Sequence, residues 1–294
     1  MLLCTHTGRP EAVATAREML SRLMDAGMRV SVLADEAAEL TSDGVDVADV
    51  ADPVDGCELV VVLGGDGTIL RGAELVRGTQ VPLLGVNLGH VGFLAESERD
   101  DLAATSQRVV DRDYEVEERM TLDVTVLVDG EVVARSWALN EASVEKATSE
   151  RMLQLVIEVD GRPLSHLGCD GVVLATPTGS TAYAFSAGGP VVWPQVEALL
   201  LVPNAAHALF ARPLVVAPTS TLAVEVLAHG PNSAVMWCDG RRKFELGPGS
   251  RVEVTRGVLP VRLARLARGP FTDRLVAKFR LPVHGWRGHG PTGS

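Results

Sequence analysis

The chain has 294 residues, of which 46% are hydrophobic and 22% charged, and its formal net charge is −11. This length allows one large domain or two modest ones, each with a real core. The acidic balance argues against nucleic acid as the main partner, because binding it needs a basic face. No apolar stretch approaches the roughly 20 residues of a membrane span, and the N-terminus shows no secretory signal. We therefore expect a cytoplasmic protein that does not bind membranes.

The four cysteines, Cys4, Cys57, Cys169 and Cys238, are far apart in the sequence. They form no Cys-x-x-Cys pair, which argues against a zinc site or a disulfide framework. We expect small buried thiols in a reduced compartment. No residue of the chain is predicted to be a metal ligand.

Residues 1–115 alternate strand and helix patterns, which is typical of a parallel sheet with helices on both faces. Ligands bind such sheets at the carboxyl ends of the strands, and the glycine-rich turns 64–67 and 89–92 fall at such ends. The predicted strands are 2–5, 28–33, 57–63 and 81–86, and the predicted helices are 10–26, 68–76 and 101–110.

The first turn reads Gly-Gly-Asp-Gly and follows the apolar run 59–63. Paired glycines allow positive φ angles and let a ligand approach the main chain, and Thr68 can cap the helix that follows. A helix N-terminus presents free N–H groups, so Gly64, Gly65 and Thr68 are candidate phosphate ligands. The carboxylate of Asp66 is out of place beside phosphates unless it takes a proton or meets a metal.

A turn without further function is the alternative, because Asp-Gly is a common turn dipeptide. The same dipeptide recurs at 129–130, 160–161, 170–171 and 239–240.

Near residue 115 the hydrophobic period changes to two, with Asp-Gly turns between the runs, which predicts antiparallel hairpins. We therefore expect an α/β domain at 1–115 and a β-rich domain at 116–262. The remaining segment, 263–294, is expected to pack back on the first domain through its amphipathic stretch 271–279. The glycine-rich tail from about 284 is expected to be mobile.

Residues 170–190 contain a short strand, 172–175, and then a run of hydroxyl side chains that suits phosphate oxygens and ribose hydroxyls. Tyr183 also offers a face on which a base could stack. The alternative is a Ser/Thr-rich turn that caps a helix at Ser180 or Thr181. The hydroxyl residues are Thr176, Thr178, Ser180, Thr181, Tyr183 and Ser186.

The pair Asn140-Glu141 ends a predicted hairpin strand. An Asn amide can read an adenine edge, and a carboxylate can accept hydrogen bonds from ribose hydroxyls. Taken alone, most such pairs are surface residues without a ligand.

The string GGDGT at 64–68 resembles the phosphate-site signature of a superfamily that includes NAD kinases, diacylglycerol and sphingoid kinases and 6-phosphofructokinases. The chain as a whole resembles bacterial NAD kinases, and its tail LVAKFRLPVHGWRG looks like the actinobacterial members. The resemblance covers nearly the whole chain and implies the fold of the NAD kinase/diacylglycerol kinase-like superfamily. The matching motifs occur in order: NLGHVGFLAE at 87–96, ERM at 118–120, NE at 140–141 and DGVVLATPTGSTAYAFSAGGP at 170–190.

The resemblance implies phosphorylation of the 2′-hydroxyl of the adenosine ribose of NAD, from ATP or polyphosphate, to give NADP. Asp66 matches the family's proton acceptor, and Asn140 and Glu141 match the pair that holds the NAD adenosine. Phe93 matches an aromatic that packs on the adenine. The other positions that match NAD ligands are Gly67, Arg71, Arg151, Asp170, Thr178, Thr181, Ala182, Tyr183, Ala184, Phe185 and Ser186.

By the same resemblance, Mg²⁺ or another divalent cation is expected to arrive on the donor phosphates, with few protein ligands. Family members form dimers or tetramers, so a homodimer or homotetramer is expected. Two departures affect the outer contacts: Gly168 stands where many members carry a basic residue, and Arg241 stands where some carry Gln. The sequence leaves open the preferred donor, the acceptance of NADH and feedback by NADP or NADPH.

Three other functions compete with this interpretation. A lipid kinase could share GGDGT, but the chain shows no basic amphipathic helix for a membrane surface. A non-catalytic NAD sensor would keep 170–190 without needing a carboxylate at Asp66. A dehydrogenase is disfavoured because no Gly-x-Gly-x-x-Gly opens the first helix.

Overall fold

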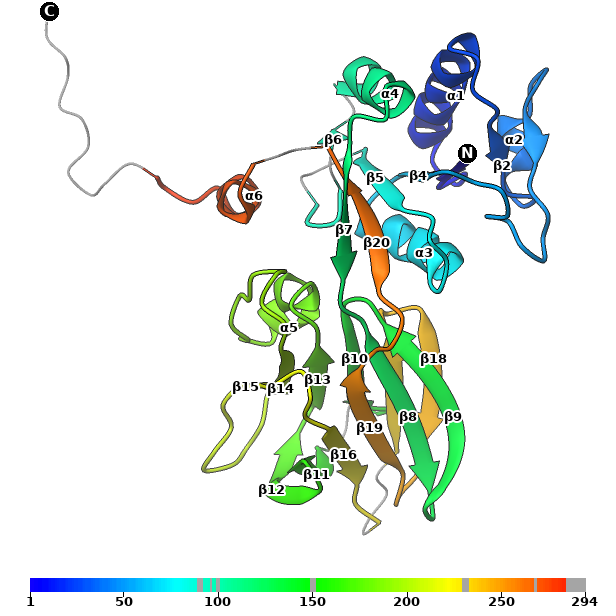
Figure 1. Cartoon of the computed structure of the whole chain (residues 1–294). Helices are drawn as coiled ribbons and strands as arrows, with labels where there is room; N and C mark the ends of the chain where they lie inside the picture. The colour runs from blue at the N-terminus through cyan, green and yellow to red at the C-terminus, as the bar shows by residue number, and fades with distance from the viewer. Residues whose placement is uncertain are drawn as a thin grey trace, which may run out of the picture. The chain divides into compact units, whose positions relative to one another are not determined.

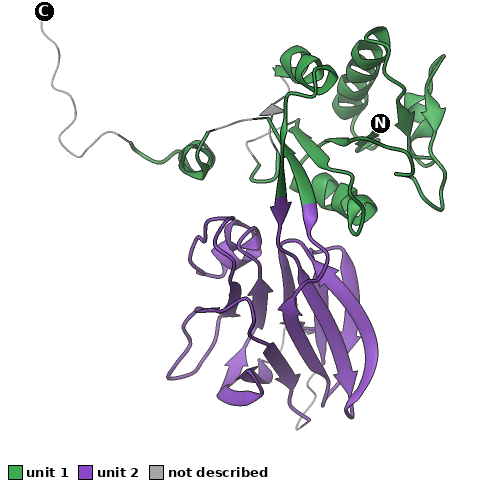
Figure 2. Ribbon diagram, in the orientation of Figure 1, with its two compact units in different colours: residues 1–117, 262–294 green, residues 118–261 purple. Residues whose placement is uncertain are grey.

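The computed structural model describes residues 1–88, 92–95, 97–98, 101–148, 152–228, 233–266 and 269–283. The chain forms two compact units (Figure 2): unit 1 contains residues 1–117 and 262–294, and unit 2 contains residues 118–261. The chain therefore leaves unit 1, builds unit 2 and returns. The candidate ligand Arg151 and the tail from 284 lie outside the described residues.

Unit 1 is built on one sheet in the order β3-β2-β1-β4-β5-β20-β7, with β6 paired to β5 (Figure 1). The pairs β1–β2, β1–β4, β2–β3, β4–β5 and β5–β20 are parallel. The elements are β1 (Leu2–Thr5), α1 (Pro10–Asp25), β2 (Ser31–Val32), α2 (Ala37–Leu40), β3 (Asp46–Val47), β4 (Val60–Leu63), α3 (Asp66–Val76), β5 (Leu83–Asn87), β6 (Ser97–Glu98), α4 (Leu102–Val110), β7 (Glu115–Arg119), β20 (Val261–Arg265) and α6 (Phe271–Phe279).

Helices cover both faces of this sheet, as the sequence pattern predicts. The buried side chains of α1 and α4 share one cluster with alternate strand residues such as Leu3, Val61 and Leu63. On the other face α3 approaches the sheet closely. A Cβ on Gly72 would lie 2.5 Å from Val62. Because successive side chains of a strand point to opposite faces of the sheet, each strand packs against the helices on both faces.

Unit 2 consists of two antiparallel sheets of six strands, in the orders β15-β14-β13-β10-β17-β18 and β12-β11-β16-β19-β8-β9. The strands are β8 (Leu122–Val128), β9 (Glu131–Ala138), β10 (Glu141–Lys146), β11 (Leu153–Val159), β12 (Arg162–Cys169), β13 (Gly171–Ala175), β14 (Leu199–Asn204), β15 (Leu214–Val216), β16 (Leu222–Val226), β17 (Ala234–Cys238), β18 (Arg242–Leu246) and β19 (Arg251–Arg256). A short 3-10 helix, η2 (Gly179–Thr181), and α5 (Tyr183–Ser186) follow β13.

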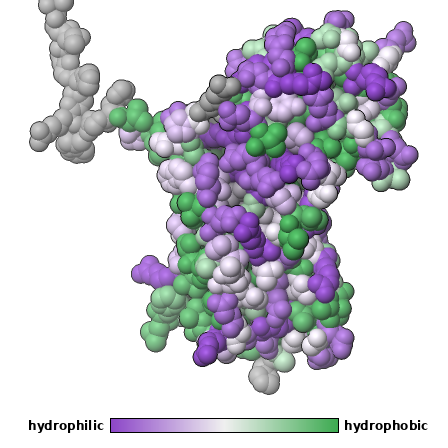
Figure 3. All heavy atoms as spheres, in the orientation of Figure 1, coloured by the Kyte–Doolittle hydropathy of each residue, from purple (hydrophilic) through white to green (hydrophobic). Residues whose placement is uncertain are grey.

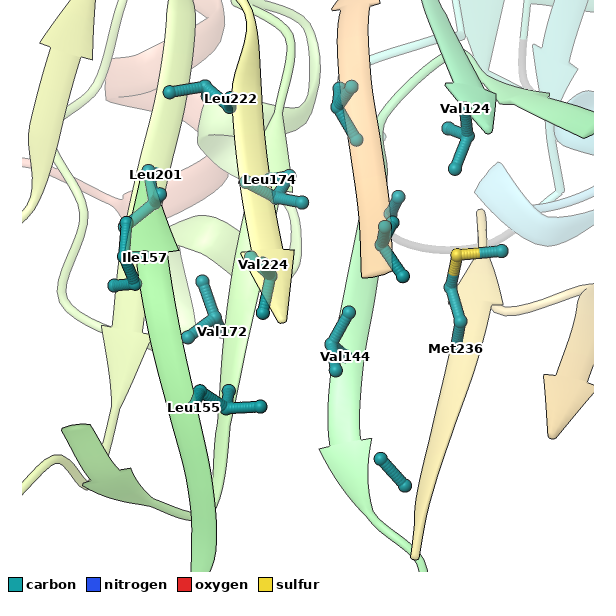
Figure 4. Packing of buried hydrophobic residues seen from close by; sticks show 14 of the residues in the cluster. Val124, Val144, Leu155, Ile157, Val172, Leu174, Leu201, Leu222, Val224 and Met236 are labelled. Carbon is teal, nitrogen blue, oxygen red and sulfur yellow. The ribbon is translucent and has the colours of Figure 1, made fainter. Parts of the chain in front are cut away.

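The core of unit 2 lies between its two sheets. Side chains from both sheets, such as Leu155 and Val224 from one and Val144 and Val172 from the other, form one buried cluster (Figure 4). The predicted hairpins are present. Asp129 and Asp160 both have positive φ at the turns that join β8 to β9 and β11 to β12. These are the backbone conformations that Asp-Gly tolerates well.

Polar and apolar residues are interspersed over the face drawn in Figure 3. None of the helices in the described ranges combines the length and the apolar character that crossing a membrane requires.

Candidate functional site

The phosphate turn, residues 64–67, joins the end of β4 to the start of α3. Two details of its prediction were wrong. The helix begins at Asp66 with Gly65 as its N-cap and no side-chain cap, so Thr68 lies inside the first turn. Neither glycine of the pair Gly64-Gly65 has positive φ.

The surroundings of these glycines differ: Gly64 is closely packed, whereas Gly65 and Gly67 face open space among the described residues. A Cβ on Gly64 would lie 2.6 Å from Thr68 Oγ1, which leaves no room for one. At Gly65 and Gly67 a Cβ would meet none of the described residues within 4 Å. The turn therefore presents bare backbone at the N-terminus of a helix of 11 residues, which is suited to an anion.

The carboxylate of Asp66 stands at this N-terminus. Its Oδ1 is buried and has no hydrogen-bond partner within the described part of the chain. The carboxylate lies directly against Gly92, where a Cβ would be 2.5 Å from Oδ1. A buried acceptor without a partner is costly, so this oxygen is suited to accept a hydrogen bond from a further donor, such as a substrate hydroxyl.

The contact between Asp66 and Gly92 gives a first prediction. In Gly92→Ala the added methyl displaces the carboxylate, and we expect turnover to fall by about 10²-fold, as misplacement by about 1 Å can cause. The affinity for NAD, measured by calorimetry, should stay unchanged.

The matched control is Gly247→Ala, because a Cβ at this position meets no described residue within 4 Å. Equal turnover in the two alanine variants would show that Gly92 does not position Asp66.

Two further candidate residues of unit 1 make specific contacts. Arg71, in the second turn of α3, pairs with Asp35 at 2.7 Å and with Glu36 at 2.9 Å. Phe93 packs on α6, with its ring centroid 6.1 Å from that of Phe271 and 5.7 Å from that of Phe279. The candidate adenine-stacking residue thus rests against the C-terminal helix.

In unit 2, the backbone at Asn140-Glu141 is clamped from two sides. The Asp239 carboxylate accepts hydrogen bonds from the N–H groups of Leu139 at 2.9 Å, Asn140 at 2.7 Å and Glu141 at 3.3 Å. Thr176 donates from its N–H to the Asn140 carbonyl at 2.9 Å and from its hydroxyl to that of Leu139 at 2.6 Å. Asn140 and Glu141 are 6% and 9% exposed, so this pair is not an ordinary surface pair.

Asp239 is not among the predicted site residues, because its Asp-Gly dipeptide predicts only a turn. The residue does sit at the β17–β18 turn with positive φ, but its carboxylate points into unit 2. Arg242 donates to it at 2.8 Å and to the Trp137 carbonyl at 2.9 Å, with its guanidinium 4.4 Å from the Trp137 ring centroid. The sequence signal, Asp-Gly, is the same as at six other places in the chain.

The hydroxyl-rich stretch rests on Asn140. A Cβ on Gly179 would be 2.0 Å from the Asn140 carbonyl oxygen, so only glycine fits there. The hydroxyl of Ser180 donates to the Pro177 carbonyl at 2.7 Å and that of Thr181 donates to the Thr178 carbonyl at 3.2 Å.

The hydroxyls of Thr176, Ser180 and Thr181 thus stabilise the loop itself. Neither η2 nor α5 has a side-chain N-cap, so the alternative of a helix cap at Ser180 or Thr181 is wrong.

A pocket of about 360 Å³ opens beside this clamp. Burial, and next the charge of Asp239, raise the pKa of Glu141 to about 8, although the Tyr183 N–H donates to its carboxyl group. Near neutral pH Glu141 therefore holds a proton and can both donate and accept, which suits ribose hydroxyls better than phosphates. The pocket is lined by Glu141, Ser143, Glu145, Tyr183, Trp237, Asp239 and Gly240.

Asp170 is connected to Tyr183 through Asn204. The Asp170 N–H donates to the Asn204 carbonyl at 3.1 Å, and the Asn204 amide donates to the Tyr183 hydroxyl at 3.2 Å. Lys146, on the neighbouring strand, lies 2.5 Å from the Asp170 carboxylate. A cation therefore faces Asp170 although position 168 is glycine.

The chain matches the family profiles of two domains along most of its length. The ATP-NAD kinase N-terminal domain matches residues 1–114, and the ATP-NAD kinase C-terminal domain matches residues 139–266. NAD kinase 2 of Streptomyces coelicolor is 63% identical over 291 residues, which are 98% of this chain and 96% of that protein.

Two solved structures share the fold. The yeast NADH kinase complexed with NADH matches 97% of this chain and 88% of its own, with a TM-score of 0.87 and 24% identity. An NAD kinase from Archaeoglobus fulgidus in complex with ATP matches 95% of this chain and 98% of its own, with a TM-score of 0.69 and 25% identity. These matches confirm the predicted fold class. The profiles and the Streptomyces relative show the rest: the chain belongs to the NAD kinase family of phosphotransferases.

Proposed function

We propose that this chain transfers the terminal phosphoryl group of ATP, or of polyphosphate, to the 2′-hydroxyl of the adenosine ribose of NAD, which gives NADP. The observation that carries the proposal is the Asp66 carboxylate at the open N-terminus of α3, whose Oδ1 has no hydrogen-bond partner among the residues that the structure describes. The relatives named NAD kinase and the solved complex with ATP support the two substrates.

The mechanism follows from what the residues of unit 1 can do. Phosphoryl transfer has a loose transition state, so alignment and charge neutralisation matter more than a strong base. The N–H groups of Gly65, Asp66 and Gly67 receive the donor phosphates. The predicted ligands Gly64 and Thr68 do not contribute their N–H groups, because these donate to the Val86 carbonyl at 2.9 Å and to the Gly65 carbonyl at 2.9 Å. Asp66 accepts a hydrogen bond from the 2′-hydroxyl through its carboxylate, aligns the hydroxyl, and takes its proton as the new bond to phosphorus forms.

A divalent cation, Mg²⁺ in the simplest case, fits this site as a companion of the donor. No group of three or more His, Cys, Asp or Glu that could hold a metal is found among the described residues. The phosphate turn contains a single carboxylate, Asp66, and so offers the cation few ligands. In this proposal the donor phosphates supply the other ligands. When bound, the cation neutralises phosphate charge.

Unit 2 supplies the nucleoside contacts in this proposal. The Asn140 amide reads the adenine edge, Glu141 holds the ribose hydroxyls, and Tyr183 lies against the rings. The remaining proposed NAD ligands are Gly67, Arg71, Phe93, Arg151, Asp170, Thr178, Thr181, Ala182, Ala184, Phe185 and Ser186. A homodimer or homotetramer in the cytoplasm completes the proposal, and sedimentation velocity tests its assembly state.

A coupled assay for NADP tests the function, with NAD and Mg-ATP in one well and NAD and polyphosphate in another. NADP in either well supports the proposal and indicates the donor. No product, with NAD binding intact by calorimetry, would favour a non-catalytic NAD sensor. If neither product nor binding is found, the lipid-kinase alternative returns.

The role of Asn140 gives a second prediction. The clamp binds the Asn140 backbone, so Asn140→Ala keeps the clamp and removes only the amide. We expect the KM for NAD to rise about tenfold, as the loss of one hydrogen bond typically causes, with kcat nearly unchanged. Steady-state kinetics with varied NAD measure both constants, and an unchanged KM would remove Asn140 from the adenine site.

A further inference from the structure

A buried carboxylate of unit 1 has no part in the mechanism above. Glu36 lies just before α2 and is 1% exposed. Its Oε2 accepts a hydrogen bond from the Thr5 N–H at 2.9 Å, and its Oε1 accepts one from Arg71 Nη1 at 2.9 Å. Carboxylates are almost never fully buried unless they are paired, so the partner of Glu36 is informative.

This ion pair lies next to the phosphate turn. Thr5 is the last residue of β1 and is paired in register with Leu63, the last residue of β4. The Thr5 hydroxyl donates to the Leu63 carbonyl at 3.0 Å, and Gly64 follows directly. Arg71 comes from α3, the helix that follows the phosphate turn. Glu36 therefore fixes a guanidinium at the sheet edge where the phosphates are proposed to bind.

The two carboxylates that hold Arg71 differ in exposure. The Glu36 side chain is 1% exposed, whereas the Asp35 side chain, which takes Arg71 Nη2 at 2.7 Å, is 70% exposed. An exposed ion pair contributes little to stability and can exchange with water. A phosphate oxygen is a strong partner for a guanidinium and could replace Asp35 without disturbing the buried bond to Glu36.

We propose that Glu36 is a positioning residue that aims Arg71 at a phosphate group of a substrate, and that Asp35 competes with this phosphate for Arg71. The inference rests on the proposed function and extends it to two residues. The phosphate belongs either to the donor or to the diphosphate of NAD, and separate kinetic measurements distinguish these sources.

The titration of Glu36 gives a test through the pH dependence of KM. A purely structural role for Glu36 would leave this pH dependence unchanged. The pKa of Glu36 is raised to about 7, mainly by burial and also by the charge of Asp35, while the Thr5 N–H and Arg71 oppose the shift. A further titratable group that interacts with Glu36 is the Cys4 thiol, whose pKa is raised by burial and by Glu36. Glu36 is thus charged above about pH 7 and loses its charge as the pH falls through this value, which weakens its bond to Arg71.

The experiment compares wild type with Glu36→Gln and Asp35→Asn, measuring the KM for ATP and the KM for NAD in separate series. We expect Glu36→Gln to raise one of these constants about tenfold, through loss of a charged hydrogen bond. Asp35→Asn should lower the same constant about threefold, because an exposed competitor is removed. The substrate that responds identifies the source of the phosphate.

Two further measurements complete the test. Below pH 7 the KM of the responding substrate should rise more steeply in wild type than in Glu36→Gln, a comparison in which protonation of the substrate itself cancels. Calorimetry with inorganic tripolyphosphate should show tighter binding in Asp35→Asn than in wild type if the phosphate is that of the donor. Glu39→Gln is the matched control, since Glu39 is 55% exposed and pairs with Arg17 at 3.9 Å.

The outcomes separate this inference from the proposed function. If wild type makes NADP but neither variant changes either KM, or both variants raise it, the inference is overturned. If Glu36→Gln does not fold, Asp35→Asn decides, because this exposed change should not affect folding and an unchanged KM would contradict the competition. If wild type makes no NADP, the proposed function fails and the inference fails with it.

Discussion

Asp66→Asn is expected to fold normally, to bind NAD and to lose at least about 10²-fold in turnover, the range typical of general-base removal. The amide has the size of the carboxylate, so it fits against Gly92, where a Cβ would lie 2.5 Å from Oδ1. It cannot take the proton of the 2′-hydroxyl. Single-turnover measurement of NADP formation, together with calorimetry for NAD, separates the chemical step from binding.

Asp43→Asn is the matched control, since Asp43 is an exposed carboxylate of the same unit. Near-normal turnover in Asp66→Asn would rule out Asp66 as the proton acceptor. An equal loss of turnover and of NAD affinity would make Asp66 a substrate ligand instead.

The parts of the fold that sequence reasoning predicts well are those encoded locally. The strands predicted at 57–63 and 81–86 are present as β4 and β5. They and the Asp-Gly turns at 129–130 and 160–161 carry their own periodicity and turn chemistry. The strand β20 is different. It pairs in parallel with β5 from nearly 180 residues away in sequence, with Leu263 opposite Leu83. Nothing in residues 261–265 indicates which sheet they join, because an apolar alternation fits either.

The same distinction holds for the candidate site. Asp66 can be found from the sequence because it follows a recognisable strand, and Asn140-Glu141 can be found because it matches a motif of the NAD kinases. Glu36 and Asp239 cannot, because each acts through a partner brought close only by the fold: Glu36 meets Arg71 across 35 residues, and Asp239 meets Asn140 across 99. Residue type also misleads. Ser180 suggests a ligand contact, but its hydroxyl binds the loop to itself.

Asp239→Asn is expected to destabilise the protein by about 3–5 kcal/mol, the cost of breaking a buried charged pair by changing one partner. The carboxylate accepts three backbone N–H groups and Arg242 Nη2. An amide offers one oxygen to these four donors and turns its own NH₂ toward the rest, so at least one buried donor loses its partner. Denaturant unfolding followed by fluorescence measures the change in the free energy of unfolding.

The effect on binding should accompany the loss of stability. The released backbone is that of Asn140 and Glu141, so the Kd for NAD should rise even at temperatures where the variant stays folded. Asp129→Asn is a close control: Asp129 has φ of 51°, against 55° for Asp239, and also precedes a glycine in a hairpin turn, but it is exposed.

Asn tolerates this left-handed conformation, so the control should stay within about 0.5 kcal/mol of wild type. If both variants behaved alike, the turn geometry of Asp239 would matter and its carboxylate would not. If Asp239→Asn lowers the free energy of unfolding much more than Asp129→Asn does, the Asp239 carboxylate stabilises the backbone of the nucleoside site in addition to forming a turn.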